Sequence, residues 1–335
     1  MPARALLLLG QLQRDTILTA DGKARVDQAG GNLLYAAAAC QLWGENPGLV
    51  ARVGSDYPAK WLDELAARGL DMQSIKVLDE PQDLRRFIAY TDTYSPHGDN
   101  PVKHFGKWGL AVPKALLNYR GSPRKPDSKK ERTPLTLRAK DLPSAYHGIR
   151  AAHLCPMDYF SHSLMPAALR EAGVAQITLE AAPGYMQPAF WNELPALVNG
   201  LSAILVEEAL LRELFAGRAE ELWDMVEDLA AYNCAAVVVR SAARGLWLYE
   251  TDSRKRTHLP PYPARTYDIT DTGSSFCGAF AVELGRSQDW QRALLLAAAT
   301  ASLAVEGSGA FYVGDTLPGL AESRAQLLEG AIKIV

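Results

Sequence analysis

Short apolar runs alternate along most of the chain with segments of helical periodicity. The apolar runs predict strands at Ala5–Leu9, Gly48–Val53, Arg86–Thr91, Arg150–Leu154, Ala175–Leu179, Ser202–Val206 and Ala235–Val239. Apolar positions at helical spacing predict helices at Asn32–Trp43, Pro58–Arg68, Ser163–Glu171, Trp191–Val198, Ala219–Tyr232, Ser274–Gly285 and Trp290–Val305. Continuous apolar strands that alternate with helices are typical of a mainly parallel sheet covered on both faces. The pattern therefore predicts an α/β fold.

Two regions depart from this alternation. The first 100 residues hold more strand-like and turn-like pieces, which predict a small sheet over the ligand edge of the core. Asn118–Lys140 is rich in Lys, Arg, Pro and Ser and poor in large apolar side chains. That composition favours a solvated, partly disordered loop, with a lid or a docking surface for an acidic partner as the alternative. We interpret residues 113–143 as a basic insertion in a single domain of residues 1–335.

Composition narrows the class of protein. A chain of 335 residues is long enough for one large core, and its formal net charge of −3 excludes a whole-protein basic field for nucleic acid. No apolar run reaches the ~20 residues needed to span a bilayer. The four cysteines are scattered without a C-x-x-C pair, which indicates a reducing compartment and predicts a cytoplasmic location.

The histidines give no sign of a metal centre. None of the six has metal-ligand spacing within an expected helix or hairpin. They are His97, His104, His147, His153, His162 and His258. The sequence therefore predicts no metal site built from protein side chains.

The most informative stretch is Asp268–Phe280 (DITDTGSSFCGAF), in which a polar turn runs directly into a helix. Free backbone N–H groups at such a helix start, with the helix dipole behind them, form an anion site. Gly273 would let a ligand approach the backbone closely. A plain helix start with Asp271 or Thr272 as the N-cap is the alternative.

This stretch resembles the D-T-x-G-A-G-D-x-F-x-G signature of the ribokinase/PfkB carbohydrate kinase family. Asp268, Gly273, Phe276 and Gly278 match it without a gap. Further matches follow in the family's order along nearly the whole chain. They are Gly10–Asp15 (the first strand and its sugar-contacting Asp), Gly30–Asn32 (the G-G-x-x-x-N-x-A helix), Gly54–Asp56 with Gly69–Asp71, Glu207–Ala209 (the N-x-x-E region) and Gly307–Ala310 (the C-terminal loop).

The resemblance implies a three-layer α/β/α core with a small β lid, whose strands would fall within residues 10–30 and 84–112. The family transfers the γ-phosphoryl group of ATP, with Mg²⁺, to a hydroxymethyl group of a sugar, nucleoside or similar alcohol bound under the lid. The last Asp of G-A-G-D is its general base, and the preceding backbone N–H groups form an anion hole. A homodimer through the lid sheet is also implied.

Carried over position by position, the resemblance assigns candidate residues to three groups. The catalytic group is Ser274, at the general-base position, with Asp271, Thr272 and Gly273. The substrate-binding group is Asp15, Gly30, Gly31, Asn32 and Tyr35. The nucleotide-binding group is Glu208, Arg240, Gly245 and Gly309.

The sequence differs from the family pattern at the positions of the general base, the anion hole and the nucleotide-binding loop. A serine hydroxyl at position 274 cannot hold the substrate proton at neutral pH, and general-base assistance is worth roughly 10²–10⁴-fold in rate. Asp271 replaces a glycine of the anion hole and would oppose a polyphosphate unless a metal ion intervened. Tyr35 stands where the family has Asn, and only Gly245 remains of the T-x-G-x-x-G motif.

The sequence thus favours a PfkB-type homologue that is a weak or inactive kinase and retains a small-molecule alcohol or sugar ligand. The alternative is an active ATP-dependent sugar, nucleoside or cyclitol kinase that uses ATP and Mg²⁺ and a non-standard base such as Asp271.

Overall fold

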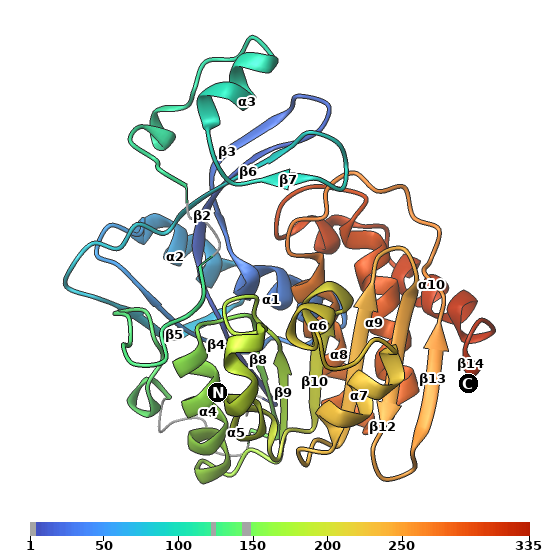
Figure 1. Cartoon of the computed structure of the whole chain (residues 1–335). Helices are drawn as coiled ribbons and strands as arrows, with labels where there is room; N and C mark the ends of the chain where they lie inside the picture. Colours follow the sequence, from blue (N-terminus) through green and yellow to red (C-terminus); the bar gives the residue numbers. More distant parts are fainter. Residues whose placement is uncertain (1–4, 122–124, 143–148) are drawn as a thin grey trace.

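The computed structural model describes residues 5–121, 125–142 and 149–335 (Figure 1). Residues 122–124 and 143 of the predicted basic insertion, and His147, lie outside the described residues.

A ten-stranded sheet forms the centre of the molecule, in the order β14-β13-β12-β11-β10-β9-β8-β1-β4-β5. The run from β11 to β5 is parallel, and β12, β13 and β14 extend it antiparallel. Its strands are β1 Leu6–Leu9, β4 Gly48–Val53, β5 Asp71–Val77, β8 Ala151–Leu154, β9 Gln176–Glu180, β10 Ala203–Glu207, β11 Ala236–Ser241, β12 Gly245–Glu250, β13 Lys255–Leu259 and β14 Lys333–Ile334. The predicted α/β class with a mainly parallel sheet is confirmed.

Helices cover both faces of this sheet (Figure 1). One face carries α4 Tyr159–Glu171, α5 Leu194–Val198, α6 Glu208–Leu214 and α7 Leu222–Ala230, and the other carries α1 Asn32–Leu42, α2 Ala59–Ala67, α8 Thr272–Ser287, α9 Trp290–Ala304 and α10 Leu320–Glu329. Alternate residues of β10 pack into opposite layers: Ile204 and Val206 into the first, Leu205 into the second. Continuous apolar strands are therefore needed here, because both of their faces are buried.

A smaller four-stranded sheet lies over one end of the large sheet (Figure 1). Its order is β3-β2-β6-β7, and its strands are β2 Gln13–Leu18, β3 Ala24–Gly30, β6 Arg85–Tyr90 and β7 Pro96–His97. Helix α3 Pro101–Lys107 packs on it, with Phe87 and Phe105 stacked at 5.9 Å between ring centroids. This lid has an apolar core of its own, which fixes the strands that reach toward the large sheet.

The described part of the basic insertion packs on the core although it has little regular structure. Only the short 3₁₀ turns Lys114–Leu116 and Ala139–Asp141 occur in it. Arg52 of β4 forms a buried, two-pronged ion pair with Asp141, at 2.8 and 2.9 Å. Lys129 pairs with Glu193 at 2.8 Å.

Two further 3₁₀ turns span Pro188–Glu193 and Tyr312–Asp315. Among the described residues, none of the helices is both long enough and apolar enough to span a bilayer.

Candidate functional site

An arginine of the lid joins two carboxylates where the lid meets the core. Asp15 of β2 and Arg86 of β6 are direct neighbours in the parallel register of these strands. The guanidinium donates to both oxygens of Asp15, at 2.9 and 2.7 Å, and to both oxygens of Asp271, at 3.0 and 2.6 Å. Arg86 thereby connects the lid to the start of α8.

The backbone explains how Asp271 comes to stand at this point. Asp271 precedes α8 in the left-handed conformation, with φ 46° and ψ 23°. Glycine adopts this conformation at least cost, and aspartate is one of the few other residues that tolerate it. The ion pair with Arg86 helps to hold Asp271 there.

Burial dominates the electrostatics of this trio. It raises the pKa of Asp15, which is only 3% exposed, and Arg86 opposes that rise. Burial alone would lower the pKa of Arg86, but Asp15 and Asp271 raise it well above its ordinary value. The guanidinium is therefore permanently charged, and it occupies the carboxylate oxygens that a ligand hydroxyl would use.

A second buried group surrounds the expected base position. The Ser274 hydroxyl donates to Glu180 Oε2 at 2.8 Å, and Arg240 Nη2 donates to Glu180 Oε1 at 2.7 Å. Ser274 is 2% exposed and Glu180 4%. Burial raises the pKa of Glu180, although Arg240 opposes the shift. A methyl group on Gly273 would overlap the Arg240 guanidinium, so the cation lies directly against the first turn of α8.

Three buried polar atoms here have no hydrogen-bond partner within the described parts of the chain: Tyr35 Oη, Thr272 Oγ1 and Arg240 Nε. Buried polar atoms are normally paired, and an exception needs a reason such as a bound ligand or water. These atoms come from α1, the start of α8 and the end of β11. They are thus candidates for holding a polar small molecule.

The other substrate-side candidates have structural partners. Gly30 lies against the Asp15 carboxylate, and Gly31 has φ 94° and donates to Asp15 Oδ2 at 3.2 Å. The Asn32 side chain accepts from the Gln11 N–H at 2.9 Å and donates to a backbone carbonyl at 2.7 Å. Asn32 therefore fixes the start of α1.

Comparison with known proteins agrees with this architecture. Residues 158–315 match the family model described as pfkB family carbohydrate kinase. The chain is 22% identical to the cytidine kinase of Thermococcus kodakarensis over 293 residues, which are 87% of this chain and 92% of that protein. It is 29% identical over 169 residues to the bifunctional protein HldE of Bradyrhizobium diazoefficiens, covering 48% of this chain and 33% of that one.

Solved structures show the same fold across the chain. The nucleoside kinase of Burkholderia thailandensis in complex with inosine has a TM-score of 0.68 at 17% identity, over 97% of both chains. A putative ribokinase II from E. coli in complex with ATP and Mg²⁺ has a TM-score of 0.69 at 16% identity, over 97% of this chain and 99% of that one. The chain thus carries a PfkB family domain, matched over residues 158–315, and it has the fold of these solved kinases along nearly its whole length.

PfkB kinases use ATP, which binds as a complex with Mg²⁺. The question is whether Glu208, a nucleotide-side candidate, could bind that ion. Glu208 at the start of α6 is bound by Arg212 at 2.8 Å and by Arg244 at 2.6 Å. A carboxylate engaged by two guanidinium groups is a poor Mg²⁺ ligand, because Mg²⁺ prefers free oxygen donors. Glu208, paired in this way, therefore does not fit a Mg²⁺ ion.

The remaining PfkB-loop glycines keep scaffold roles. Gly245 starts β12 with φ 91°, against the carbonyl of Leu259. Gly309 has φ 95°, and a methyl group at this position would lie 3.0 Å from the Arg25 guanidinium of β3. Both positions require the left-handed backbone that glycine allows.

Two cavities lie apart from the Ser274 region. One of about 550 Å³ is lined by α1 and Phe311–Glu322, and one of about 420 Å³ by β3, α2 and Ser308–Asp315. Arg68 and Phe311, stacked at 4.4 Å, separate them. Neither is lined by the candidate catalytic residues. Beside the start of α8 itself stand the ion pairs of Arg86 with Asp271 and of Arg240 with Glu180.

Two groups of potential metal ligands occur within the described residues, each with its ligand atoms within 4.8 Å of one another. His153, Glu180 and Cys277 form the first group, which is buried and adjoins Ser274 through Glu180. Arg240 already neutralises Glu180, and burial raises the pKa of Cys277 well above its ordinary value, so the thiol keeps its proton. This group is therefore unsuited to a cation. The second group lies in the lid, at His97, Asp99 and His104.

Sequence reasoning missed Arg86 and Glu180, the residues that bind Asp271 and Ser274. A signal existed for Glu180, which directly follows an apolar run at the carboxyl end of a predicted parallel strand, where ligand sites of α/β folds lie. Arg86 had a weaker one, as a charged residue in a lid strand.

Proposed function

We propose that this protein is a PfkB-type homologue with a substituted catalytic base, which transfers phosphoryl groups weakly or not at all and retains a small-molecule ligand. The observation that carries the proposal is the Ser274 hydroxyl, which stands at the base position and is committed as a donor to Glu180. The hydroxyl cannot take up a substrate proton at neutral pH.

The charges around Ser274 support the same conclusion. Asp271, the alternative base considered from the sequence, has both carboxylate oxygens bound by Arg86. A guanidinium that binds both oxygens occupies the lone pairs with which a base would take up a proton. Glu208 is paired with two arginines in turn. The carboxylates of Asp271, the alternative base, and of Glu208, a nucleotide-side candidate, are thus already paired with arginines of the same chain.

Binding of a hydroxyl-bearing molecule fits the same site better than phosphoryl transfer does. Tyr35 Oη and Thr272 Oγ1 are buried hydroxyls without a partner within the described residues. Each can donate one hydrogen bond and accept others, as sugar and nucleoside hydroxyls require. The similarity to a cytidine kinase and to a nucleoside kinase in complex with inosine supports an alcohol-bearing ligand.

The second candidate is an active kinase in which Glu180 supplies the base through Ser274. Ser274 Oγ lies 2.8 Å from Glu180 Oε2, and burial raises the pKa of that carboxyl, which makes it a better proton acceptor. A substrate hydroxyl would pass its proton to Ser274 Oγ as the serine proton moves to Glu180, so that the serine is unchanged and Glu180 ends protonated. This route needs no change in the position of either side chain.

The test measures binding and turnover on one set of proteins. Ribose, fructose, cytidine, inosine and myo-inositol are offered with Mg²⁺-ATP, and binding is followed by calorimetry and ADP release by a coupled assay. The variants are S274D, which restores the family's carboxylate, E180Q, which cannot accept a proton, and S323D as a matched control on an exposed helix position.

We expect the wild type to bind at least one of these alcohols and to release ADP no faster than background. S274D should raise the rate by up to roughly 10²–10⁴-fold, and S323D should not change it. Measurable turnover in the wild type that disappears in E180Q would establish the second candidate instead. A protein that neither binds an alcohol nor turns over ATP contradicts both.

A homodimer through the lid, an acidic partner for the basic insertion and a cytoplasmic location remain predictions from the sequence. The first has support from Val26 of β3, which is 40% exposed on the lid sheet.

A further inference from the structure

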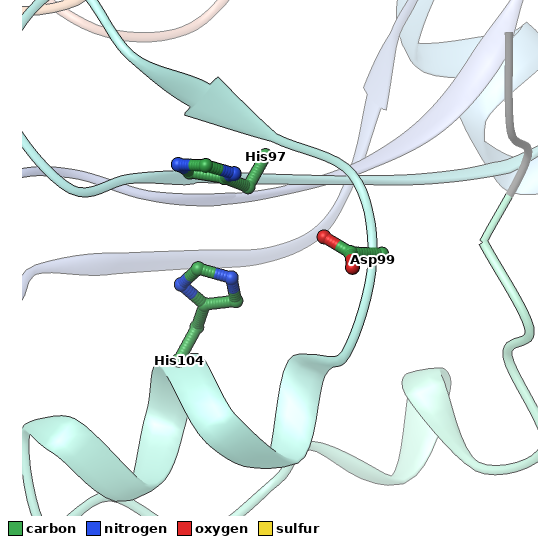
Figure 2. A group of neighbouring side chains, drawn as sticks. All are labelled: His97, Asp99 and His104. Carbon is green, nitrogen blue, oxygen red and sulfur yellow. The ribbon is translucent and has the colours of Figure 1, made fainter.

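The lid carries two imidazoles and a carboxylate that face one another, far along the chain from the Ser274 region. Figure 2 shows His97, Asp99 and His104, with the carboxylate directed toward the two rings. We propose that these three side chains form a binding site for one divalent transition-metal ion of the zinc class. The proposal does not depend on the proposed function.

The backbone brings these residues together. His97 ends β7, and Asp99 lies in the turn that follows. Asn100 then adopts the left-handed conformation, with φ 45°, and caps α3 by accepting the Lys103 N–H. This reversal of the chain brings His104, on the inner face of α3, under His97, with 5.3 Å between ring centroids and 28° between ring planes.

The spacing is close to what a metal requires. One ligand atom from each side chain lies within 4.8 Å of the others. Around a tetrahedral Zn²⁺ with bonds of about 2.0–2.1 Å, neighbouring ligand atoms are roughly 3.4 Å apart. His97 and Asp99 are exposed, so rotation of their side chains can close this gap without moving the buried His104.

Neighbouring side chains hold both imidazoles in their orientation: Thr91 contacts His97, and Phe87 contacts His104. Thr91 Oγ1 lies 3.2 Å from His97 Nε2, which leaves Nδ1 of that ring for a metal. His104 packs against Phe87, at 6.0 Å between ring centroids, in the apolar core of the lid. A metal-ligating histidine typically has its second nitrogen or its ring position fixed in this way.

The donor atoms decide which class of ion fits. A site of two nitrogens and a single carboxylate suits Zn²⁺, Co²⁺ or Ni²⁺ and not Mg²⁺ or Ca²⁺, which prefer oxygen ligands.

A bound ion would tie β7 to α3. The pairing of Ala89 with His97 joins β7 to β6, the strand that presents Arg86 to Asp15 and Asp271. The ion would therefore stiffen the outer part of the lid, at one end of the strand that closes the candidate site.

The experiment uses tag-free full-length protein, stripped with a chelator and returned to metal-free buffer. Zn²⁺ is titrated by competition with a chromophoric chelator, and Co²⁺ is added as a spectroscopic probe of the ligand geometry. The variants are H97A and D99N, which change exposed side chains, and T91A, which removes the supporting hydroxyl together with the γ-methyl group. H258A serves as the control, because it removes another accessible histidine outside the lid.

We expect the wild type and H258A to bind one equivalent of Zn²⁺. Their Co²⁺ complexes should show visible absorption bands typical of four- or five-coordinate cobalt. H97A and D99N should weaken binding by at least about tenfold, and T91A by a smaller factor. Circular dichroism of each metal-free variant establishes that it is folded. Equal binding by wild type and H97A, or no stoichiometric binding by the wild type, overturns the proposal.

Discussion

The bridge made by Arg86 can be tested by replacing it with methionine, which keeps the length of the side chain and removes its charge. In R86M the buried Asp15 loses its counter-ion, and Asp271 is left beside it. Removing one partner from a buried ion pair typically costs about 3–5 kcal/mol. Arg86 is 22% and Asp271 18% exposed, so residual hydration reduces the expected loss to roughly 2–4 kcal/mol at pH 7.

The loss should also depend on pH. Burial already raises the pKa of Asp15, and removing the arginine raises it further. Where the folded pKa exceeds the unfolded one, the native state binds more protons, so stability falls as pH rises through that window. Lowering the pH from 7 toward 4 should therefore protonate the unpaired carboxyl and return part of the stability that R86M loses.

Urea unfolding followed by tryptophan fluorescence measures this effect. With an m-value of about 3 kcal/mol/M, a loss of ~3 kcal/mol lowers the midpoint by about 1 M. The matched control is R14M, on the neighbouring strand β2, whose pair with Asp27 is more accessible and should contribute about 1 kcal/mol or less. Equal losses in R86M and R14M, or an R86M loss that does not shrink at low pH, would refute the reasoning.

Three further predictions concern the core. Asp141→Asn should destabilise the protein by about 3–5 kcal/mol in urea unfolding, because the Arg52 charge loses its buried partner; a midpoint within experimental error of the wild type would show that the pair is dispensable. Gly278→Ala should cost about 1–3 kcal/mol, since its methyl group would overlap the backbone of α1, whereas a methyl group on Gly285 in the same helix would lie 3.2 Å from the Cβ of Ala151 and should cost less. All four cysteines are buried, and burial raises the pKa of Cys234 to about 12, so the native protein should release no thionitrobenzoate at pH 8 and the urea-unfolded chain four equivalents; rapid reaction of the native protein would contradict this.

The periodicity of the sequence predicted the core well because each of its strands is buried on both faces. Gly48–Val53 forms β4 with the predicted bounds, and Asn32–Trp43 differs from α1 by one residue. The segment predicted as one helix at Trp191–Val198 begins earlier, as a 3₁₀ turn at Pro188–Glu193, because proline favours a helix start and the chain tightens around it.

Elements at the edge of the fold were harder to predict. Strand β3 (ARVDQAG) is mostly exposed, so it lacks an apolar run, and it is held by pairing with β2. Helix α6 has only seven residues, too few to show a clear helical period. In both cases the stabilising contacts come from neighbours in space.

The candidate site divides in the same way. The sequence by itself determined that a serine stands at the base position and an aspartate at the anion hole. Only the tertiary structure decided their partners: Glu180 is 94 residues from Ser274, and Arg86 is 185 residues from Asp271. Charge pairing depends on distance in space and on burial, and neither can be calculated until the parallel sheet and the lid have brought those segments together. The same holds for His97 and His104, whose spacing acquires meaning only through the chain reversal at Asn100.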